Sequence, residues 1–533
     1  MTGIEAAGPP EPAMSRGRNI KLLAVIICVA AGLRLYTFAG YVGLDDAEYA
    51  RLAHSMLEGA FGAGAYSGPA VFPLRVGIIA PAAASFGIFG VSGWSMVLPS
   101  LIVSLLSIML VYTLATRVFD ARAGLIAAAL WALLPLDLQA GATTLLPDLP
   151  AAFYASVAVA CILAADRAGT TGRAGLVGWG VLAGLMFGLS WLCKESVAYF
   201  APFVVMLAVA RFRRRMRHGL ALWSGVAVGA AAVLLGETII YHASTGDWLF
   251  RAHQVQRNQL EIRDGFFTEG SRWGWPRGGS YARGLLKRLF VTGPQAILLN
   301  AQLLYLPLVG VLASAYALFW KERSLYVPAL WLLTLCFMFN FATSHFAYYA
   351  PLALFGRYLF PIAFPAVIVV SGFLSRLLFE RGAGPFEVQR ERLFWGTAIA
   401  MAIGLVAARQ TLEQLREARS PRGWAPEARV VSSLTRPSDT IYTDRLSQHA
   451  LEFYWRYPAD VATVNFEGMK SLDRVAPGAL VFVHPRAIDW LTVNSGMWLT
   501  NNSPYEVPDV TGKASSSWSV VWQGGGAALY RVQ

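Results

Sequence analysis

Charge and cysteine are both scarce in this sequence. Of its 533 residues, 14% are charged and 56% are hydrophobic, whereas about 25% are charged in a typical soluble domain. The mean hydropathy is +0.48, and long apolar runs recur from Ile20 to about Ala408. This balance excludes an ordinary soluble protein. It predicts a polytopic α-helical membrane protein followed by a polar C-terminal part.

The cysteines are too few and too scattered for a disulfide framework or a metal site. No Cys-x-x-Cys spacing occurs, and each cysteine lies within or beside an apolar run, so we interpret them as small packing residues. His242 and His253 share a polar segment but repeat no ligand spacing. No metal and no other cofactor is therefore predicted. The four cysteines are Cys28, Cys161, Cys193 and Cys336.

Lysine and arginine give the chain a net charge of +12, but they cluster in short segments between apolar runs. That distribution is typical of the cytoplasmic loops of membrane proteins. Nucleic acid is therefore not expected as a partner.

The apolar runs predict about eleven transmembrane helices, each close to the length that a bilayer requires. They lie at about 20–40, 94–116, 122–142, 149–165, 176–193, 197–210, 219–241, 295–320, 325–344, 357–378 and 393–408. With this count the basic loops fall on one side, which the positive-inside rule assigns to the cytoplasm. These loops contain Arg16/Arg18/Lys21, Arg117/Arg122, Arg167/Arg173, Arg211 to Arg217, Lys321/Arg323 and Arg376 to Arg392.

One further apolar segment, Phe72 to Gly90, would reverse the side of every later loop if it crossed the membrane. It contains Pro73, Arg75 and Pro81, and we expect it to lie in the external interface. The external side then carries a first loop at 41–93 and a large loop at 242–294.

The scheme divides the chain into a cytoplasmic tail at 1–19, a membrane domain at 20–408 and an external domain at 409–533. In the last part the hydrophobic period changes to that of a small α/β domain. Strands are predicted at Thr440–Asp444, Ala479–Val483, Trp518–Trp522 and Ala527–Val532, and a helix at Leu446–Tyr457.

The sequence Asp45-Asp46-Ala47-Glu48-Tyr49-Ala50 directly follows the first apolar run. A carboxylate within the bilayer costs roughly 2.5–3.5 kcal/mol on insertion scales, so the cluster is expected at the membrane surface. One carboxylate suffices to cap a helix. Three favour chemistry, in which one acts as a general base and its neighbour orients or caps. Which of Asp45 and Asp46 is the base stays open.

Other ionisable residues fall on the same predicted face. Asp148 stands between Pro147 and Pro150, as a turn residue or a second acid. Lys194 closes a span and either extends to the interface or contacts a phosphate. Arg357 opens a late span on the external side, against the positive-inside trend, and bidentate binding of a lipid phosphate would explain it.

Further residues near these positions are candidates for contact with substrate. Aromatic residues at an interface also serve as membrane anchors, so that reading stays open for the tyrosines among them. The candidates are Glu48, Tyr49, His345, Tyr348 and Tyr358.

The acidic motif resembles the Asp-Glu-Ala-x-Tyr-Ala signature of the large GT-C glycosyltransferases that use a polyprenyl-phosphate sugar. The likeness is greatest to the protein mannosyltransferase-like, aminoarabinose and lipopolysaccharide galacturonosyl transferases. It covers about residues 20–410. It includes the interfacial segment Phe72 to Gly90, Asp148, Leu192-Cys193-Lys194 and the Arg-Tyr-Leu-x-Pro opening from Arg357 to Pro361.

This resemblance implies that Asp45 is the catalytic carboxylate, Asp148 the second external acid, and Lys194 and Arg357 contacts of the donor phosphate. The chain departs from the family in two places. Asp46 stands where glutamate is usual, which leaves the identity of the base open. Glu195 stands where glycine is common, which places a carboxylate near the implied phosphate site.

The implied protein is an inverting hexosyl- or pentosyltransferase of the inner (plasma) membrane. It would transfer a sugar from a polyprenyl phosphate to an envelope lipid, glycan or protein at the external face. A transporter or a lipid or glycan flippase is the alternative, but such proteins carry charges within their spans, and here the spans have few. A polymer-binding anchor protein would leave the acidic motif unexplained. The sugar and the acceptor stay open.

Overall fold

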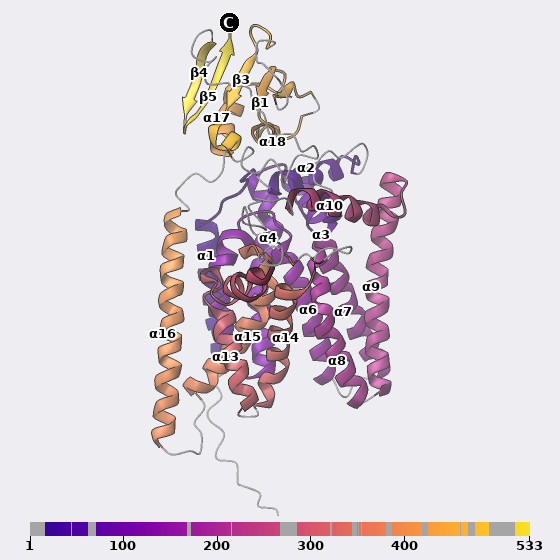
Figure 1. Cartoon of the computed structure of the whole chain (residues 1–533), viewed down its shortest axis with the longest axis vertical. Coiled ribbons are helices and arrows are strands. Elements are labelled where there is room, and N and C mark those ends of the chain that lie inside the picture. Colours follow the sequence, from indigo (N-terminus) through magenta and orange to yellow (C-terminus); the bar gives the residue numbers. More distant parts are fainter. Residues whose placement is uncertain are drawn as a thin grey trace, which may run out of the picture.

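The computed structural model describes residues 16–43, 45–61, 71–167, 172–214, 216–266, 285–319, 322–343, 349, 351–352, 354–379, 386–417, 425–458, 460–466, 475–489 and 518–533. Within them, helices form a bundle, and a small α/β domain lies at one end of it (Figure 1). The helices of the first half are α1 (Arg16–Tyr36), α2 (Asp45–Leu57), α3 (Val76–Phe89), α4 (Gly93–Val118), α5 (Ala121–Ala132), α6 (Asp148–Arg167), α7 (Arg173–Cys193), α8 (Ala201–Arg214), α9 (Met216–Thr245) and α10 (Phe250–Phe266). Those of the second half are α12 (Gly293–Leu298), α13 (Leu306–Phe319), α14 (Tyr326–Phe341), α15 (Phe360–Phe379), α16 (Phe386–Glu417), α17 (Ala425–Leu434) and α18 (Arg445–Tyr454).

Nine helices in the described part of the chain are long and apolar enough to cross a membrane. They are α1, α4, α6, α7, α8 with the turn before it, α9, α14 and α15 with the turns before them, and α16. Each coincides with a predicted span. The prediction of a polytopic helical membrane protein is confirmed.

The two remaining predicted spans, 122–142 and 295–320, contain shorter helices. Helix α5 has 12 residues, which rise only about 18 Å at roughly 1.5 Å per residue, against a hydrocarbon core of about 30 Å. It ends before Pro135, which disfavours helical geometry in the residue ahead of it. Helix α13 has 14 residues and follows Leu304 and Tyr305, both with φ of +55°. Left-handed residues break a helix, so apolarity overestimated the length of both helices.

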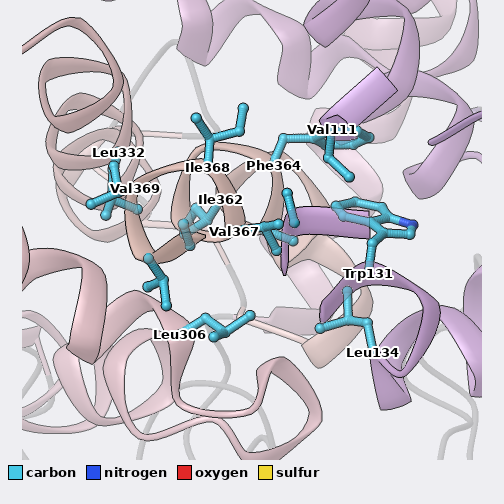
Figure 2. Packing of buried hydrophobic residues seen from close by; sticks show 14 of the residues in the cluster. Val111, Trp131, Leu134, Leu306, Leu332, Ile362, Phe364, Val367, Ile368 and Val369 are labelled. Atoms are coloured by element: carbon cyan, nitrogen blue, oxygen red, sulfur yellow. The ribbon is translucent and has the colours of Figure 1, made fainter. Parts of the chain in front are cut away.

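Helix α15 forms the centre of the bundle. Residues 360–372 are buried on every side of the helix, which is typical of a helix surrounded by other helices. Figure 2 shows Phe364 and Val367 of α15 beside Trp131 of α5 and Val111 of α4, with α13 and α14 on another side. The segment that leads into α15 is therefore held by a rigid core.

The apolar segment Phe72 to Gly90 does not cross the bundle. The side chain of Arg75, just before α3, donates to the carbonyl of Cys193 at the end of α7. At the other end of the segment, the rings of Trp94 and Phe38 stack with centroids 3.8 Å apart, close to the end of α1. Both ends of α3 thus lie at the same end of the bundle, as the interfacial reading requires.

Two boundaries differ from the expectation. The predicted loop 242–294 includes the end of α9 and the helix α10, which lies across that end of the bundle (Figure 1). Helix α16 continues to Glu417, past the predicted end of its span at 408, because charged residues follow its apolar part without interrupting the helix.

The C-terminal domain contains one five-stranded sheet with the order β2-β1-β3-β5-β4. The strands are β1 (Ile441–Thr443), β2 (Thr463–Asn465), β3 (Leu480–Val483), β4 (Trp518–Gly524) and β5 (Ala527–Val532). Strands β1, β2 and β3 are parallel, and β4 and β5 form an antiparallel hairpin. The four predicted strands and the helix after β1 are present. Strand β2 and helix α17 were not predicted, since three residues such as Thr463–Asn465 give too short a pattern.

Candidate functional site

The candidate site forms where four helix ends meet. Asp45 begins α2, Asp148 begins α6, Lys194 follows the last residue of α7, and Arg357 lies in the short helix Gly356–Leu359 that leads into α15. Each position is separated from the others by dozens of residues or more, and the packing of the bundle brings them together.

Arg357 joins two of the acids. Its Nη2 donates to Asp45 Oδ2 over 2.6 Å, and its Nε lies 3.8 Å from Asp148 Oδ2. The Asp148 side chain is 3% exposed, whereas those of Asp45 and Arg357 are 18% and 29% exposed. Asp45 and Arg357 therefore form the accessible edge of the site, and Asp148 forms its buried floor.

Lys194 completes the floor. Its amine donates to Asp148 Oδ1 and lies 3.4 Å from the centre of the Tyr358 ring. Burial lowers the pKa of Lys194 to about 8, helped by the nearby Arg75 and Arg357 and opposed by Asp148. The amine is therefore mostly charged at neutral pH, and Tyr358 lies beneath the cation.

The second aspartate of the motif faces its own loop. Asp46 Oδ2 accepts hydrogen bonds from the backbone amides of Val42, over 2.7 Å, and Gly43, over 3.3 Å. Asp46 thus holds the turn that precedes α2, while Asp45 points to Arg357. The two neighbouring carboxylates have different environments.

Arg75 was named only as a residue of the interfacial segment and not as a site candidate, although it lies beside the site. It forms an ion pair with Glu195 over 3.4 Å, and its buried Nε has no hydrogen-bond partner among the described residues. Glu195 also pairs with Arg251 over 3.0 Å, and Arg251 binds Glu237. The carboxylate that seemed to oppose a phosphate at Lys194 is therefore bound by two arginines. An arginine inside an apolar segment, such as Arg75, is the signal that could have indicated this.

The remaining candidates lie in different places. Tyr49 is buried, with its ring 4.8 Å from that of Phe72, so it packs α2 against the interfacial segment. Glu48 faces the C-terminal domain, where it pairs with Arg445 of α18. His345 and Tyr348 lie outside the described residues.

One buried ion pair within the bundle was not anticipated when the spans were expected to contain few charges. Arg34 of α1 and Asp137, which follows α5, form an ion pair with both side chains fully buried. Ser104 of α4 joins them, accepting from Arg34 Nε and donating to Asp137 Oδ2, each over 2.6 Å. These contacts tie α1, α4 and the segment leading to Asp148 together within the bundle.

Comparisons with known proteins address the family resemblance and the fold. Residues 79–236 match the sequence model of the dolichyl-phosphate-mannose-protein mannosyltransferase family. Two relatives from Pseudomonas aeruginosa strains, each called undecaprenyl phosphate-alpha-4-amino-4-deoxy-L-arabinose arabinosyl transferase, are 31% identical to the chain, over 219 and 253 residues. These alignments cover 39% and 44% of the chain and 38% and 43% of the relatives.

The likeness of fold extends over nearly the whole chain. The crystal structure of ArnT from Cupriavidus metallidurans in the apo state superposes with a TM-score of 0.56 at 17% identity, covering 96% of this chain and 97% of that one. The structure of the same protein bound to undecaprenyl phosphate gives 0.55 at 16% identity, covering 97% and 98%. The resemblance drawn from the motifs is confirmed at the level of the fold, and the chain has the GT-C fold of ArnT.

Proposed function

We propose that this protein is a membrane glycosyltransferase that transfers a sugar from a polyprenyl-phosphate donor to an envelope acceptor. The observation that carries the proposal is the pairing of an accessible carboxylate, Asp45, with an accessible guanidinium, Arg357, above the buried Asp148–Lys194 pair. Transfer of a sugar from a polyprenyl phosphate needs a base for the acceptor and cations for the departing phosphate. The four side chains of this site supply both.

In the proposed reaction Asp45 accepts the proton of the acceptor hydroxyl or amine. The acceptor atom forms a bond to the anomeric carbon while the bond from that carbon to the phosphate oxygen breaks. The electron pair leaves with the polyprenyl phosphate. Because attack and departure take place on opposite faces of the sugar, the anomeric configuration is inverted.

Arg357 has a second role in this proposal. In the structure its Nη2 is bound to Asp45 Oδ2, so this carboxylate oxygen already accepts a hydrogen bond. A donor phosphate would compete for the guanidinium, which can bind it through two hydrogen bonds. Donor binding would thereby free Asp45 to accept a proton.

Lys194 and Arg75 extend the cationic side of the site. The Lys194 amine is held near Arg357 by Asp148, and the buried Nε of Arg75 has a donor to offer. We propose that these cations stabilise the leaving phosphate without a divalent metal. Transfer should then continue at an unchanged rate after treatment with a chelator.

The relatives support the choice of donor. The two Pseudomonas aeruginosa relatives are named for an undecaprenyl phosphate sugar, and one ArnT structure holds undecaprenyl phosphate. The chain spans about two fifths of the length of the curated relatives it matches. The activity is therefore proposed from the residues of this protein's own site and not from the names of the relatives. The acceptor class includes lipid, glycan and protein.

The proposed location is the external face of the inner membrane, with the N-terminus cytoplasmic and the C-terminal domain external. Basic residues at the opposite ends of the helices support this orientation through the positive-inside rule. A transporter or flippase is disfavoured, because the buried Arg34–Asp137 pair is closed off by Ser104 and fully shielded from solvent.

Mass spectrometry of the envelope glycolipids and glycans tests the proposal. Cells that lack the protein should lose one sugar from one envelope component, and the unaltered gene should restore it, whereas Asp45→Asn should not. If the envelope sugars are unchanged while transport of a lipid or glycan is lost, the protein is a transporter or flippase and not a transferase.

A further inference from the structure

The C-terminal domain contacts the acidic motif itself. Glu48, one turn of α2 after Asp45, is 3% exposed. Arg445 of α18 donates to its Oε1 over 3.2 Å, and His449 of the same helix lies 3.7 Å from that oxygen. Arg51 of α2 donates to the other oxygen over 3.1 Å. Figure 1 shows α18 on the α2 side of the sheet, between the sheet and α2.

Aromatic contacts flank this polar group on both sides. Tyr41, ahead of the motif, stacks on Phe453 of α18 with ring centroids 4.2 Å apart. His54, near the end of α2, lies 4.9 Å from Tyr457. Ala50 of α2 and Ala450 of α18 belong to one hydrophobic cluster shared by the two domains. The contact therefore extends from the turn before α2 to the last turn of that helix.

The polar group at the centre makes the contact specific. A carboxylate removed from water is costly unless charged or polar partners surround it, and removal of one partner leaves an uncompensated charge. Burial alone would raise the pKa of Glu48, but His449, Arg51 and Arg445 lower it to about 2. Glu48 is thus ionised and held in place by the C-terminal domain.

Residues three apart on a helix lie on adjacent turns of one face, so Glu48 and Asp45 move together when α2 rotates or slides. Arg357, Asp148 and Lys194, by contrast, lie on other elements, and Arg357 meets α2 through its bond to Asp45. A displaced α2 would therefore move the base away from the donor site while leaving the phosphate contacts intact.

We propose that the C-terminal domain is a positioning element for the reaction: α18 binds Glu48 and so aims Asp45 at the acceptor, which makes Arg445 and Glu48 positioning residues. This inference rests on the proposed transferase function. It assigns Glu48 of the motif to the contact between the bundle and the C-terminal domain. It also gives a reason why this domain is joined to the bundle. Loss of the contact should lower kcat while the KM for donor changes little. Misplacement by about an ångström can cost on the order of a hundredfold in rate.

The test compares Arg445→Gln with Arg436→Gln in the full-length protein. Arg436 is an exposed arginine of the same domain whose side chain forms no ion pair with the described residues, so it controls for loss of a positive charge. Using a polyprenyl-phosphate sugar that the unaltered protein accepts, we expect Arg445→Gln to lower kcat about tenfold or more, Arg445→Lys to restore much of it, and Arg436→Gln to have no effect. Glu48→Gln combined with Arg445→Gln should lose little more than the worse single variant, because both remove one interaction.

A second measurement reports on how firmly α2 is held and does not depend on enzymatic activity. Hydrogen–deuterium exchange of the amides of residues 45–57 should be faster in Arg445→Gln than in the unaltered protein or Arg436→Gln. Unchanged exchange together with unchanged kcat would overturn the inference. So would a lower yield of folded protein with a normal kcat per folded molecule, since that describes a purely structural contact. If the unaltered protein transfers no sugar, the transferase proposal fails instead, and the exchange data separate that failure from this one.

Discussion

At the scale of single residues, the two neighbouring aspartates of the acidic motif have different contacts. Asp45 and Asp46 are adjacent, yet one is bound by Arg357 and the other by the backbone amides of its own loop. A helix that begins at Asp45 turns successive side chains by about 100°, so the two carboxylates cannot face the same group. The structure thus supplies a geometric reason to assign the base to Asp45.

Asparagine substitutions test this assignment. Asp45→Asn keeps the shape of the side chain but removes its basic oxygen, and we expect transfer to fall by about 10²- to 10⁴-fold, the usual contribution of a general base. Asp46→Asn keeps an oxygen that can accept from Val42 and Gly43, and should be milder. Initial rates in membranes with equal amounts of inserted protein measure both. Equal activity of Asp45→Asn and the unaltered protein would rule out Asp45 as the base.

Arg357 gives a second prediction at this scale. A lysine in its place offers a point charge without the bidentate geometry of a guanidinium, and charge-assisted hydrogen bonds contribute roughly 1.5–3 kcal/mol. The apparent KM for donor should therefore rise about ten- to a hundredfold in Arg357→Lys, and more in Arg357→Ala. The response to acceptor concentration should hardly change. Normal donor use by both variants would mean that the phosphate is bound elsewhere, by Lys194 or Arg75.

The sequence singled out four residues that the structure brings together, but it did not predict their contacts. Asp45, Asp148, Lys194 and Arg357 stand out because charges beside apolar runs are costly and unusual. Their pairing depends on how α6, α7 and α15 pack, which no local pattern encodes. Arg75 was not proposed for the site because the segment around it was interpreted by its apolar residues. The contact of Glu48 with the C-terminal domain was not foreseen, because its partner Arg445 lies 397 positions further along the chain.

At the scale of elements, the packing of α7 on α9 depends on glycine. A methyl group on Gly180 or Gly184 of α7 would lie 2.1 Å from the carbonyl oxygen of Leu222 or Val226, respectively, both in α9. Gly225 and Gly229 of α9 face α7 in the same way. Small residues four apart let membrane helices approach closely, where van der Waals contact rather than the hydrophobic effect holds them together.

Two alanine substitutions within α7 test this packing. Gly184→Ala would place its methyl group against the backbone of α9, and we expect a lower midpoint of thermal unfolding in detergent, with a cost of about 1–3 kcal/mol as for other overpacked sites. Gly178→Ala is the matched control, since nothing lies within 4 Å of its added carbon. It should be neutral or stabilising by up to about 1 kcal/mol, because alanine favours a helix. Similar midpoints for the two variants would show that the interface tolerates separation.

The contact between α2 and α18 should weaken in acid. Burial lowers the pKa of His449 to about 4, so the separated domain takes up this proton at a higher pH, near 6.5. Stability of the contact then falls as the pH drops from about 6.5 to 4. The pKa of Glu48, about 2 in the presence of Arg51 and Arg445, extends the loss below pH 4.5. Exchange of the α2 amides, corrected for the intrinsic pH dependence of exchange, should become faster over this range. In His449→Gln the change between pH 6.5 and 4.5 should disappear.

At the scale of the whole molecule, the candidates for chemistry that lie in the described part of the chain gather at one end of the bundle. Helices α2 and α10 lie across this end, and the C-terminal domain lies beyond them (Figure 1). Long apolar runs and basic loops were enough to predict this common face. The length of α13 and the strand β2 were not predictable, because the left-handed Leu304 and Tyr305 and a three-residue pairing act through local geometry and tertiary contacts. The length of α5 was overestimated although Pro135 is visible in the sequence.

The side of the membrane on which this end lies is the last prediction. Basic residues at the opposite ends of the helices, such as Arg213 at the end of α8 and Arg117 at the end of α4, are expected in the cytoplasm. A reporter active only outside the inner membrane should therefore be inactive when fused after Arg213 and active when fused after Glu417. A reporter active only in the cytoplasm should give the reverse pattern. The result depends on the segment Phe72 to Gly90, since a true crossing there would exchange the sides of all later helix ends. A cytoplasmic signal after Glu417 would place the acidic motif and the C-terminal domain inside the cell, and the proposed transfer at the external face would then be untenable.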